Sequence, residues 1–157
     1  MIVPISNENR TQVNESIKKE WAGPLIISKG VSHDSSKQDG FASITNGNLT
    51  GYALYDISDS KCEITVLQSL LENHGIGSEL INAVKNAAIQ KGCKNLWLIT
   101  TNDNLHAIRF YQKFGFDLVA VHFNAVDSAR KLKPSIPLFG DDGIPVKHEF
   151  EFSLRLI

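Results

Sequence analysis

The segment that most constrains the fold of this chain is residues 74–81, HGIGSELI. It places two glycines and a serine at the start of an apolar-periodic helix, directly after the strand-like run CEITVLQSLL of residues 62–71. The start of a helix offers several unpaired backbone N–H groups and the positive end of the helix dipole, and glycine lets a ligand approach them closely. This geometry predicts a binding site for a phosphate group.

Length and charge narrow the class of protein. At 157 residues and 42% hydrophobic content, the chain is long enough for one domain with its own core, and no break in composition divides it. We therefore expect a single domain over residues 1–157. The net charge of -1 provides no basic footprint for nucleic acid or anionic lipid, so we expect neither nucleic acid nor a membrane as a partner.

Location and metal binding are indicated by what the sequence lacks. The start MIVPISNENR has neither the basic nor the apolar region of a signal peptide, and no apolar run approaches the roughly 18 residues that span a bilayer. We therefore expect a cytoplasmic protein. Cys62 and Cys93 lack CxxC spacing and neighbouring metal ligands, so buried reduced thiols and no metal are expected.

The apolar pattern predicts a chain that is mostly β, with helices between some of the strands. Strands are indicated where apolar residues alternate or run continuously between turn residues, and helices where they recur every three or four residues. The predicted strands are residues 2–5, 25–28, 41–45, 49–57, 62–71, 94–101, 116–123 and 147–156. The predicted helices are residues 9–21, the stretch from Ile76 up to Gly92, and residues 104–114.

Several details of this pattern predict how the elements are placed. Asn46-Gly47-Asn48 predicts a hairpin turn. Residues 94–101 are expected to form a central strand covered on both faces, whereas the alternation in residues 147–156 is typical of an edge or half-buried strand. Asp103 is a candidate N-cap for the third helix.

Two segments are expected to be loops. Residues 29–40 are polar and bounded by glycines, which predicts an exposed loop. Residues 124–146 form a longer connection than most compact domains contain, with a helical turn predicted at 125–131 and capped by Asn124. This connection is either a lid or substrate wall, or a plain surface loop.

The glycine segment does not fit two common phosphate sites. A dinucleotide-binding fold needs a third glycine or an alanine where this chain has Leu80, and it places the motif after the first strand. A P-loop needs a lysine followed by serine or threonine, which Ser78-Glu79 does not supply. No acidic cluster stands near the glycines, which favours a ligand that is not carried by magnesium.

Two blocks of the sequence together resemble the GNAT N-acetyltransferases. That family has Gln or Arg, two residues, and then Gly-x-Gly or Gly-x-Ala opening a helix. Residues 72–77, ENHGIG, match at both glycines but carry Glu72 at the first position. Residues 100–116, TTNDNLHAIRFYQKFGF, are similar to the family's N-x-x-A-x-x-[LF]-Y-x-x-x-G-F block. The resemblance spans nearly the whole chain, and residues 124–145 resemble a group of small bacterial members.

The resemblance implies an α/β (α+β) GNAT fold, with a single central mixed, largely antiparallel sheet of about seven strands flanked by helices. It also implies direct transfer of acetyl from acetyl-CoA to a primary amine of a small molecule or peptide in a ternary complex, without a metal. An acyl-CoA-binding sensor that lacks catalysis and a transferase of another acyl group remain alternatives. The resemblance does not specify the acceptor. Arg130 and Lys133 either pair with an acidic group of the acceptor or are solvated surface charges. A homodimer is possible.

The residues for the cofactor are implied by the matched positions. In the family the pyrophosphate of CoA lies at the helix start, and the pantetheine arm pairs with the preceding strand, whose N–H near Leu67 or Gln68 would bind the thioester oxygen. Asn104 would hydrogen-bond the cofactor or simply begin its helix. Glu72 is expected to turn its side chain away from the phosphates, which would repel it. The resemblance thus assigns cofactor binding to Leu67, Gln68, Ser69, His74, Gly75, Ile76, Gly77, Ser78 and Asn104.

The resemblance also implies two catalytic residues. Tyr111 matches the tyrosine near the CoA sulfur, a general acid for the departing thiolate, and the alternative is an aromatic core residue. An ammonium must lose a proton before it attacks, so a base is needed. Glu63 is the first candidate, because strand alternation would place it on the same face as Leu67 and some relatives carry a glutamate base on this strand. The alternative for Glu63 is a surface carboxylate paired across the sheet. Other candidate bases are His33, Asp56 and His122.

Overall fold

A computed structural model describes the whole chain, residues 1–157. Its elements are, in chain order, β1 (Ile2–Pro4), α1 (Arg10–Glu20), β2 (Leu25–Ser28), β3 (Val31–Asp34), the 3-10 helix η1 (Ser35–Lys37), β4 (Asp39–Thr45), β5 (Asn48–Ser58), β6 (Lys61–Ser69), α2 (Ile76–Gln90), β7 (Asn95–Thr101), α3 (Leu105–Phe114), β8 (Asp117–His122), α4 (Ala125–Leu132) and β9 (Glu149–Arg155). No helix is long and apolar enough to cross a bilayer.

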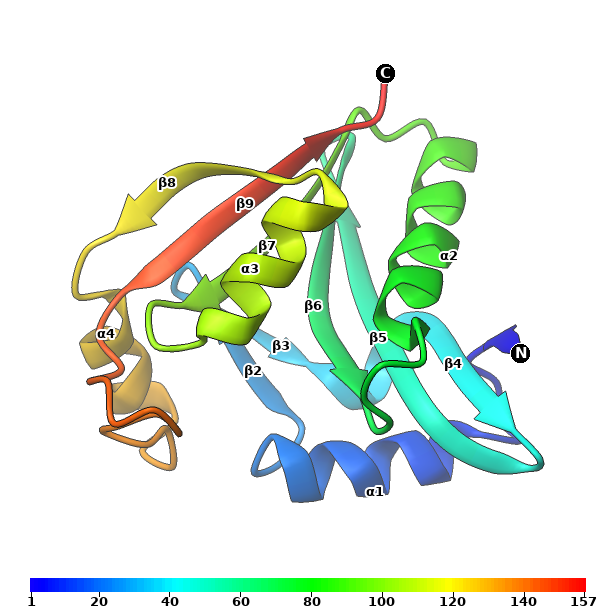
Figure 1. Cartoon of the computed structure of the whole chain (residues 1–157), viewed down its shortest axis with the longest axis horizontal. Helices are drawn as coiled ribbons and strands as arrows, with labels where there is room; N and C mark the ends of the chain where they lie inside the picture. The colour runs from blue at the N-terminus through cyan, green and yellow to red at the C-terminus, as the bar shows by residue number, and fades with distance from the viewer.

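One central sheet of seven strands organises the fold (Figure 1). The strand order is β1-β4-β5-β6-β7-β9-β8, and every neighbouring pair is antiparallel except β6 and β7, which run parallel. β2 and β3 form a separate two-stranded hairpin. The mixed, largely antiparallel sheet that the family resemblance implies is therefore confirmed.

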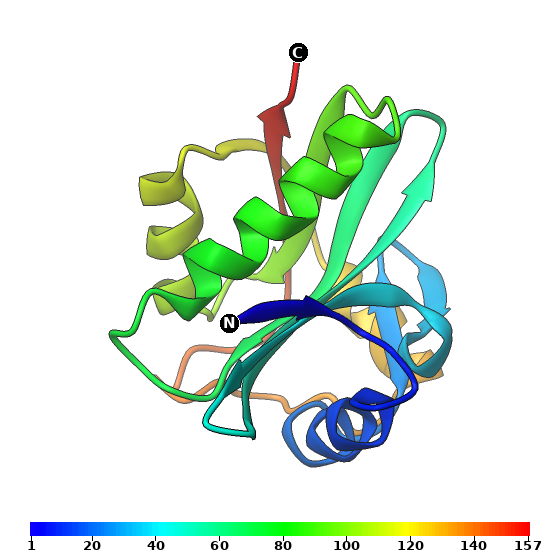
Figure 2. The same cartoon turned by 90° about the vertical axis from the view of Figure 1, so that its right-hand side faces the viewer.

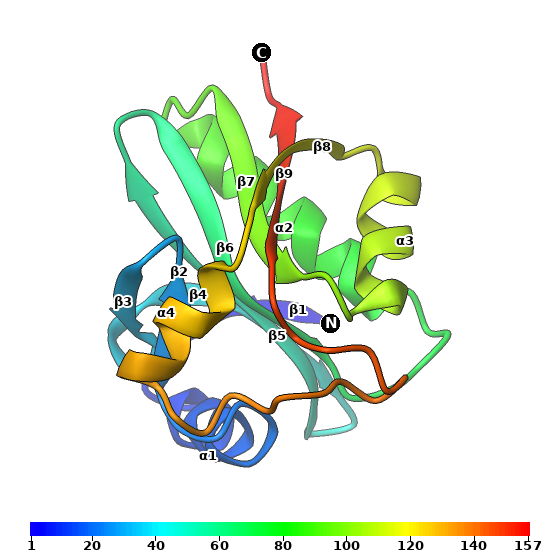
Figure 3. The same cartoon turned by 90° about the vertical axis from the view of Figure 1, so that its left-hand side faces the viewer.

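Different elements cover the two faces of the sheet. α2 and α3 lie on one face, and α1, the β2–β3 hairpin and α4 lie on the other (Figures 2 and 3). The larger core cluster packs α2 on the sheet through residues such as Leu80, Val84 and Phe152. A smaller cluster packs α1 on the opposite face through Val13 and Ile17. We call these the α2 face and the α1 face.

A glycine in β5 lets the first turn of α2 sit directly on the sheet. A Cβ on Gly51 would lie 2.7 Å from Cγ2 of Ile76 and 2.9 Å from the carbonyl oxygen of Gln68. Any larger residue would therefore push the start of α2 away from β5 and β6. The apolar side of α2, which includes the fully buried Leu80 and Val84, then packs on the strands.

β6 and β7 separate toward the starts of α2 and α3 (Figure 1). Their parallel pairing joins Lys61–Ile64 to Asn95–Leu98 and ends there, although β6 continues to Ser69 and β7 to Thr101. Beyond that point the facing edges of the two strands have no strand partner. An extended ligand can pair with such an edge in the manner of an added strand.

Residues 29–40 are not the exposed loop that their polar composition predicts. Val31–Asp34 form β3, which pairs with β2, and Ser35–Lys37 form η1. His33 and Ser35 are buried. The loop was wrongly predicted because the hairpin packs over the α1 face, where His33 and Ser35 find polar partners, whereas most of the other residues are exposed as predicted.

One smaller prediction is confirmed and two need correction. β9 lies between β7 and β8, so it is the half-buried strand that the alternation predicts and β8 is the edge. β7 is central as predicted, but only its α2 face is fully buried, at Leu96 and Leu98. The N-cap of α3 is Asn104 rather than Asp103, since the side-chain oxygen of Asn104 accepts the N–H of Ala107.

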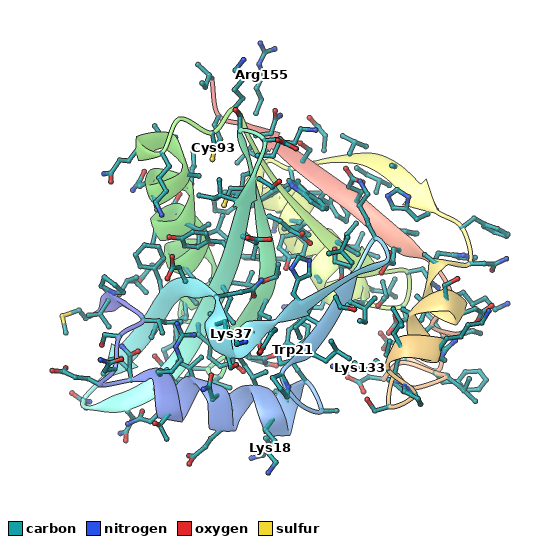
Figure 4. All side chains as sticks on the ribbon, turned by 180° about the vertical axis from the view of Figure 1, so that it is seen from behind. Lys18, Trp21, Lys37, Cys93, Lys133 and Arg155 are labelled. Carbon is teal, nitrogen blue, oxygen red and sulfur yellow. The ribbon has the colours of Figure 1, made fainter.

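The two cysteines are free and buried, as predicted. Cys62 lies in β6, and Cys93 lies between α2 and β7 (Figure 4). Burial raises the pKa of the Cys62 thiol to about 12. Because the thiolate is the reactive form, Cys62 is not a nucleophile at neutral pH.

Candidate active site

The start of α2 presents open backbone donors. Gly75 precedes the helix with φ 71°, a left-handed conformation that favours glycine, and no side chain caps the helix. The N–H of Glu79 donates to the carbonyl of Gly75, one turn back. The N–H groups of Ile76, Gly77 and Ser78 therefore have no acceptor within the helix and remain available to an anion.

Gly77 also sets the spacing between α2 and α3. A Cβ on this residue would lie 3.1 Å from Cζ of Phe110, so α3 packs closely against the first turn of α2. The Phe110 ring in turn contacts the rings of Tyr111 and Phe114. The glycine thus exposes the backbone and admits the Phe110 ring at the same time.

In the loop before α2, the His74 side chain contacts the main chain of the same loop. Nδ1 of His74 lies 2.5 Å from the carbonyl oxygen of Glu72, and both residues are exposed. The Glu72 carboxylate forms no ion pair within the chain. Its negative charge beside the start of α2 is therefore uncompensated by the protein.

A β-bulge in β6 lies where this strand separates from β7. Val66 pairs with Leu54 and Ile64 pairs with Tyr55, so Thr65 is an extra residue without a partner in β5. An extra residue of this kind breaks the regular alternation of side chains between the two faces of a strand.

The bulge places Glu63 and Leu67 on opposite faces, so the prediction that they share a face was wrong. Leu67 packs against the core on the α2 face. Glu63 instead accepts a hydrogen bond from Ser28 of the β2–β3 hairpin, on the α1 face. Residues four apart share a face only in an uninterrupted strand, which β6 is not.

Glu63 is a buried carboxyl group, 6% exposed, beside the point where β6 and β7 separate. Oγ of Ser28 donates to its Oε2 at 2.5 Å. Burial raises the pKa of Glu63 to about 7, the Ser28 hydrogen bond opposes the rise, and the Asp56 carboxylate adds to it. A carboxylate with this pKa can accept a proton near neutral pH. Its cross-strand neighbour is Asp56, so the surface ion pair considered as its alternative is not present.

Two of the other candidate bases lie beside Glu63. Asp56 is directly opposite it on β5, and the His33 imidazole of β3 lies between the two carboxylates. Nε2 of His33 is 3.5 Å from Oε1 of Glu63, and Nδ1 is 3.8 Å from Oδ2 of Asp56. Nε2 is buried and has no hydrogen-bond partner. Residues far apart in the sequence thus form one polar cluster.

The remaining candidate base, His122, belongs to a different cluster. Its Nε2 lies 2.8 Å from Oε1 of Glu151, and Nζ of Lys29 lies 3.0 Å from the same oxygen. The backbone N–H of Lys29 donates to Glu149, whose pKa is raised by burial. His122 is therefore already paired, with Glu151 rather than with Glu63.

α3 carries the two other predicted site residues. Tyr111 packs in the core on the α2 face, with its ring 5.7 Å from that of Phe116 and 5.8 Å from that of Phe152. Its hydroxyl has no hydrogen-bond partner in the protein, and burial raises the pKa of Tyr111. Asn104 uses its side-chain oxygen to cap α3, and its side-chain nitrogen donates to no protein group. A phenol proton and an amide donor are thus left for a ligand.

The two basic candidates of the long connection are held by main-chain carbonyls. Nζ of Lys133 donates to the carbonyl oxygens of Trp21, at 2.7 Å, and Leu25, at 2.5 Å (Figure 4). Arg130 pairs with Asp127 and donates to the carbonyl oxygens of Ile136, Pro137 and Val146. Both side chains therefore fasten the connection to itself and to the α1–β2 turn, and neither is free or merely solvated.

The helix within this connection, α4, is confirmed, but its predicted cap is not. Asn124 precedes α4 with φ 58° and makes no side-chain capping bond. Its backbone N–H donates instead to Nδ1 of His148. α4 lies beside the β2–β3 hairpin on the α1 face (Figure 3).

Three residues of this site, Ser28, Lys29 and Gln38, carry no sequence motif that marks them as functional. The Ser28 hydroxyl donates to Glu63, the backbone N–H of Lys29 donates to Glu149, and Nε2 of Gln38 lies 3.4 Å from Nδ1 of His33. The available signal was the alternation in VSHD after Ser28, which fits a second strand. No local pattern specifies that this hairpin folds back over β6.

Comparison with known families identifies one match. A family model described as "Acetyltransferase (GNAT) family" matches residues 11–116. The chain is 39% identical over 155 residues to the uncharacterized protein YdhI of Bacillus subtilis (strain 168), which covers 98% of this chain and 96% of that protein. It is 38% identical over 150 residues to the uncharacterized protein YxbD of the same organism, which covers 94% of each chain.

A solved structure with the same fold is that of a GNAT family acetyltransferase from Elizabethkingia anophelis with acetyl-CoA bound. The TM-score is 0.71 over 99% of this chain and 97% of that chain, at 17% sequence identity. At this identity the likeness concerns the fold.

Proposed function

Because the chain belongs to the acetyltransferase (GNAT) family, we propose that it is an N-acetyltransferase that moves the acetyl group of acetyl-CoA to a primary amine. The acceptor is a small molecule or a peptide. The observation that carries this proposal is the position of Glu63 beside the separation of β6 and β7, facing the α1 side. Tyr111 lies on the opposite, α2 side of the sheet.

The α2 side supplies the groups that would hold acetyl-CoA. The free amides at the start of α2, within residues 74–78, suit a pyrophosphate, and Ser78 adds a hydroxyl donor. The unpaired edge of β6 at residues 67–69 suits an extended pantetheine arm, with the N–H of Leu67 or Gln68 as the donor to the thioester oxygen. The free amide nitrogen of Asn104 is a further donor.

The α1 side supplies the acceptor chemistry. A primary ammonium, with a pKa near 10.4, gives a proton to the Glu63 carboxylate and becomes nucleophilic. Its nitrogen attacks the thioester carbonyl, the N–C bond forms as the C–S bond breaks, and Tyr111 gives its proton to the sulfur. The nitrogen then loses its second proton, which restores the phenol. The amine enters from the α1 face while the cofactor lies on the α2 face, so the separated strands bring the two together.

The test is a titration followed by an activity screen on the full chain. Calorimetry with acetyl-CoA measures binding, and release of free thiol is then followed with amines, polyamines, amino acids and peptides as acceptors. We expect micromolar-range binding and thiol release that depends on one class of amine. The proposal fails if neither acetyl-CoA nor CoA binds.

The same screen separates the alternatives. Binding without thiol release from any acceptor would favour an acyl-CoA-binding module, an interpretation that the uncompensated charge of Glu72 supports. Faster thiol release from a longer acyl-CoA than from acetyl-CoA would identify a different acyl donor.

A further inference from the structure

The side proposed for the acceptor holds a second buried carboxylate, which the proposed transfer does not use. Glu149, the first residue of β9, is 3% exposed. Its Oε1 accepts the backbone N–H of Lys29 at 3.1 Å, and its Oε2 receives no hydrogen bond from the protein. A buried carboxylate oxygen without a hydrogen bond is costly, so Glu149 favours a ligand that donates protons.

Glu149 and Glu63 lie near each other although they belong to β9 and β6. Glu149 is paired opposite Thr101, beyond the point where β6 and β7 separate. The Ser28 hydroxyl donates to Glu63. The next residue, Lys29, donates its backbone N–H to Glu149. Since consecutive Cα atoms are about 3.8 Å apart, one short molecule can contact both carboxylates.

The charges around the two carboxylates leave them without cations of their own. The charge of Lys29 acts on both, but its Nζ is paired with Glu151 at 3.0 Å. His122 is paired with the same oxygen of Glu151. Burial raises the pKa of both Glu63 and Glu149, and a cation bound beside them would favour their ionised forms.

The other groups beside Glu63 add no positive charge. The Thr65 hydroxyl donates to the amide oxygen of Gln38, which turns the amide nitrogen of Gln38 toward Nδ1 of His33 at 3.4 Å. An amide nitrogen only donates, so Nδ1 accepts and the His33 ring is neutral. Asp56, opposite Glu63 on β5, adds a further negative charge.

The partly buried basic residues of the connection 124–146 offer nothing to an anionic acceptor. Nζ of Lys133 donates to the carbonyl oxygens of Trp21 and Leu25. Arg130 donates to three main-chain carbonyl oxygens of its own connection. An acceptor with a carboxylate or phosphate group would therefore meet like charges, which disfavour binding.

Resting on the proposed function, we propose that the acceptor is a primary diamine whose reacting nitrogen lies at Glu63 and whose second ammonium is bound by Glu149. Ammonium and carboxylate form a charge-assisted hydrogen bond, which the free oxygen of Glu149 can accept. Because neighbouring residues hold the two carboxylates, a chain of about three to five carbons between the nitrogens fits best. Glu149 contacts the substrate and selects its class, while Glu63 takes the proton.

The test compares 1,4-diaminobutane, butylamine and 4-aminobutanoate as acceptors for thiol release at saturating acetyl-CoA. We expect kcat/KM for the diamine to exceed that for butylamine by about 10- to 100-fold, the range that a hydrogen bond between charged groups provides. The amino acid should be the slowest, because its carboxylate meets Glu149. Equal kcat/KM values for the diamine and butylamine would overturn the proposal without any variant.

Glu149→Gln tests the residue itself. Its amide oxygen can still accept the N–H of Lys29, but the negative charge is gone. The ratio of kcat/KM between diamine and butylamine should fall to about one, mainly through a higher KM for the diamine. The matched control is Asp117→Asn, which removes one negative charge at an exposed position of β8 and should keep the parent ratio. A ratio that survives in Glu149→Gln would show that Glu149 only supports the fold.

Calorimetry of 1,4-diaminobutane against the chain with CoA present separates this proposal from the proposed function. CoA carries no acetyl group, so binding is measured without turnover. If the parent releases no thiol with any acceptor, the proposed transfer fails, and diamine binding that Glu149→Gln abolishes would still support the diamine site. Absence of diamine binding to the parent would overturn the site. Acetyl transfer that is equally fast to butylamine would leave the proposed function intact and overturn only the diamine acceptor.

Discussion

Glu63 and Leu67 project from opposite faces of β6, because the bulge at Thr65 reverses the alternation between them. One strand therefore serves both sides of the sheet where it leaves β7. Leu67 and its neighbours offer an unpaired backbone edge on the side proposed for the cofactor, whereas Glu63 offers a carboxylate on the side proposed for the acceptor. An uninterrupted strand would have turned the carboxylate toward the α2 core.

The pH dependence of turnover should report Glu63. Burial raises the pKa of Glu63 to about 7, and only the carboxylate form accepts a proton. Turnover at saturating substrates should therefore rise as the pH increases through about 7 and then level. Glu63→Gln should lower turnover by about 100-fold and remove this limb, while calorimetry finds acetyl-CoA affinity unchanged. A Glu63→Gln enzyme that keeps the parent profile would exclude Glu63 as the base.

Replacing Tyr111 by Phe should separate catalysis from packing. The phenylalanine ring can keep the contacts with Phe116 and Phe152, and the lost hydroxyl has no protein partner, so the free energy of unfolding should change little. Because burial raises the pKa of Tyr111, the phenol stays protonated and able to act as an acid. Turnover should fall about 10- to 100-fold with unchanged acetyl-CoA affinity. Unchanged turnover would leave Tyr111 as a core residue only.

The order of the elements and the start of α2 could be predicted because both depend on local sequence patterns. Asn46-Gly47 marks a hairpin, Gly75 takes the left-handed conformation before α2, and apolar periodicity marks α2. These signals depend on residues that are neighbours in the chain. The cofactor side of the site, built from consecutive residues, remains the prediction that sequence patterns support best.

Gly77→Ala should show whether Gly77 matters more because it exposes the backbone of α2 or because it leaves room for the Phe110 ring. A methyl group there would lie 3.1 Å from the Phe110 ring, so α2 and α3 must shift apart by a few tenths of an ångström. We expect acetyl-CoA affinity to fall severalfold by calorimetry. Phe110→Leu, combined with Gly77→Ala, removes the crowding and should restore most of the affinity. A double variant that binds no better than Gly77→Ala would mean that the methyl group blocks the phosphate directly.

Lys133→Met should loosen the attachment of the connection 124–146 to the α1–β2 turn, on the side proposed for the acceptor. The ammonium holds the carbonyl oxygens of Trp21 and Leu25, and burial lowers the pKa of Lys133. Losing these bonds should cost about 1–3 kcal/mol of unfolding free energy in urea titrations. The acceptor KM should rise while acetyl-CoA affinity stays the same. The control is Lys37→Met, since Lys37 is 83% exposed and its removal should change neither quantity. Equal effects of the two variants would contradict this role.

The acceptor side could not be predicted because it depends on tertiary contacts. The bulge at Thr65 depends on the register of β6 against Leu54 and Tyr55 of β5, and its hydroxyl donates to Gln38; neither is visible in the run CEITVLQ. His33 lies in the polar segment 29–40, where composition predicts exposure, and Ser28 ends the predicted strand before it. They are buried because the hairpin covers carboxyl groups that need polar partners.

Glu63→Gln should stabilise the fold at high pH although it removes activity. The pKa of Glu63 is raised from 4.5 to about 7, so the folded chain holds a proton that the unfolded chain has lost over this interval. A raised carboxyl pKa gives stability that is fully present at lower pH and is lost as the pH rises through about 7, up to about 3 kcal/mol. Glutamine carries no charge, so Glu63→Gln should exceed the parent in urea titrations at pH 8 and match it near pH 4, below the unfolded-state pKa. Glu8→Gln, at an exposed position, should show no such difference between the two pH values. A parent chain as stable at pH 8 as Glu63→Gln would mean that the ionised carboxylate is fully compensated, so the buried charge that makes Glu63 a base would not be present.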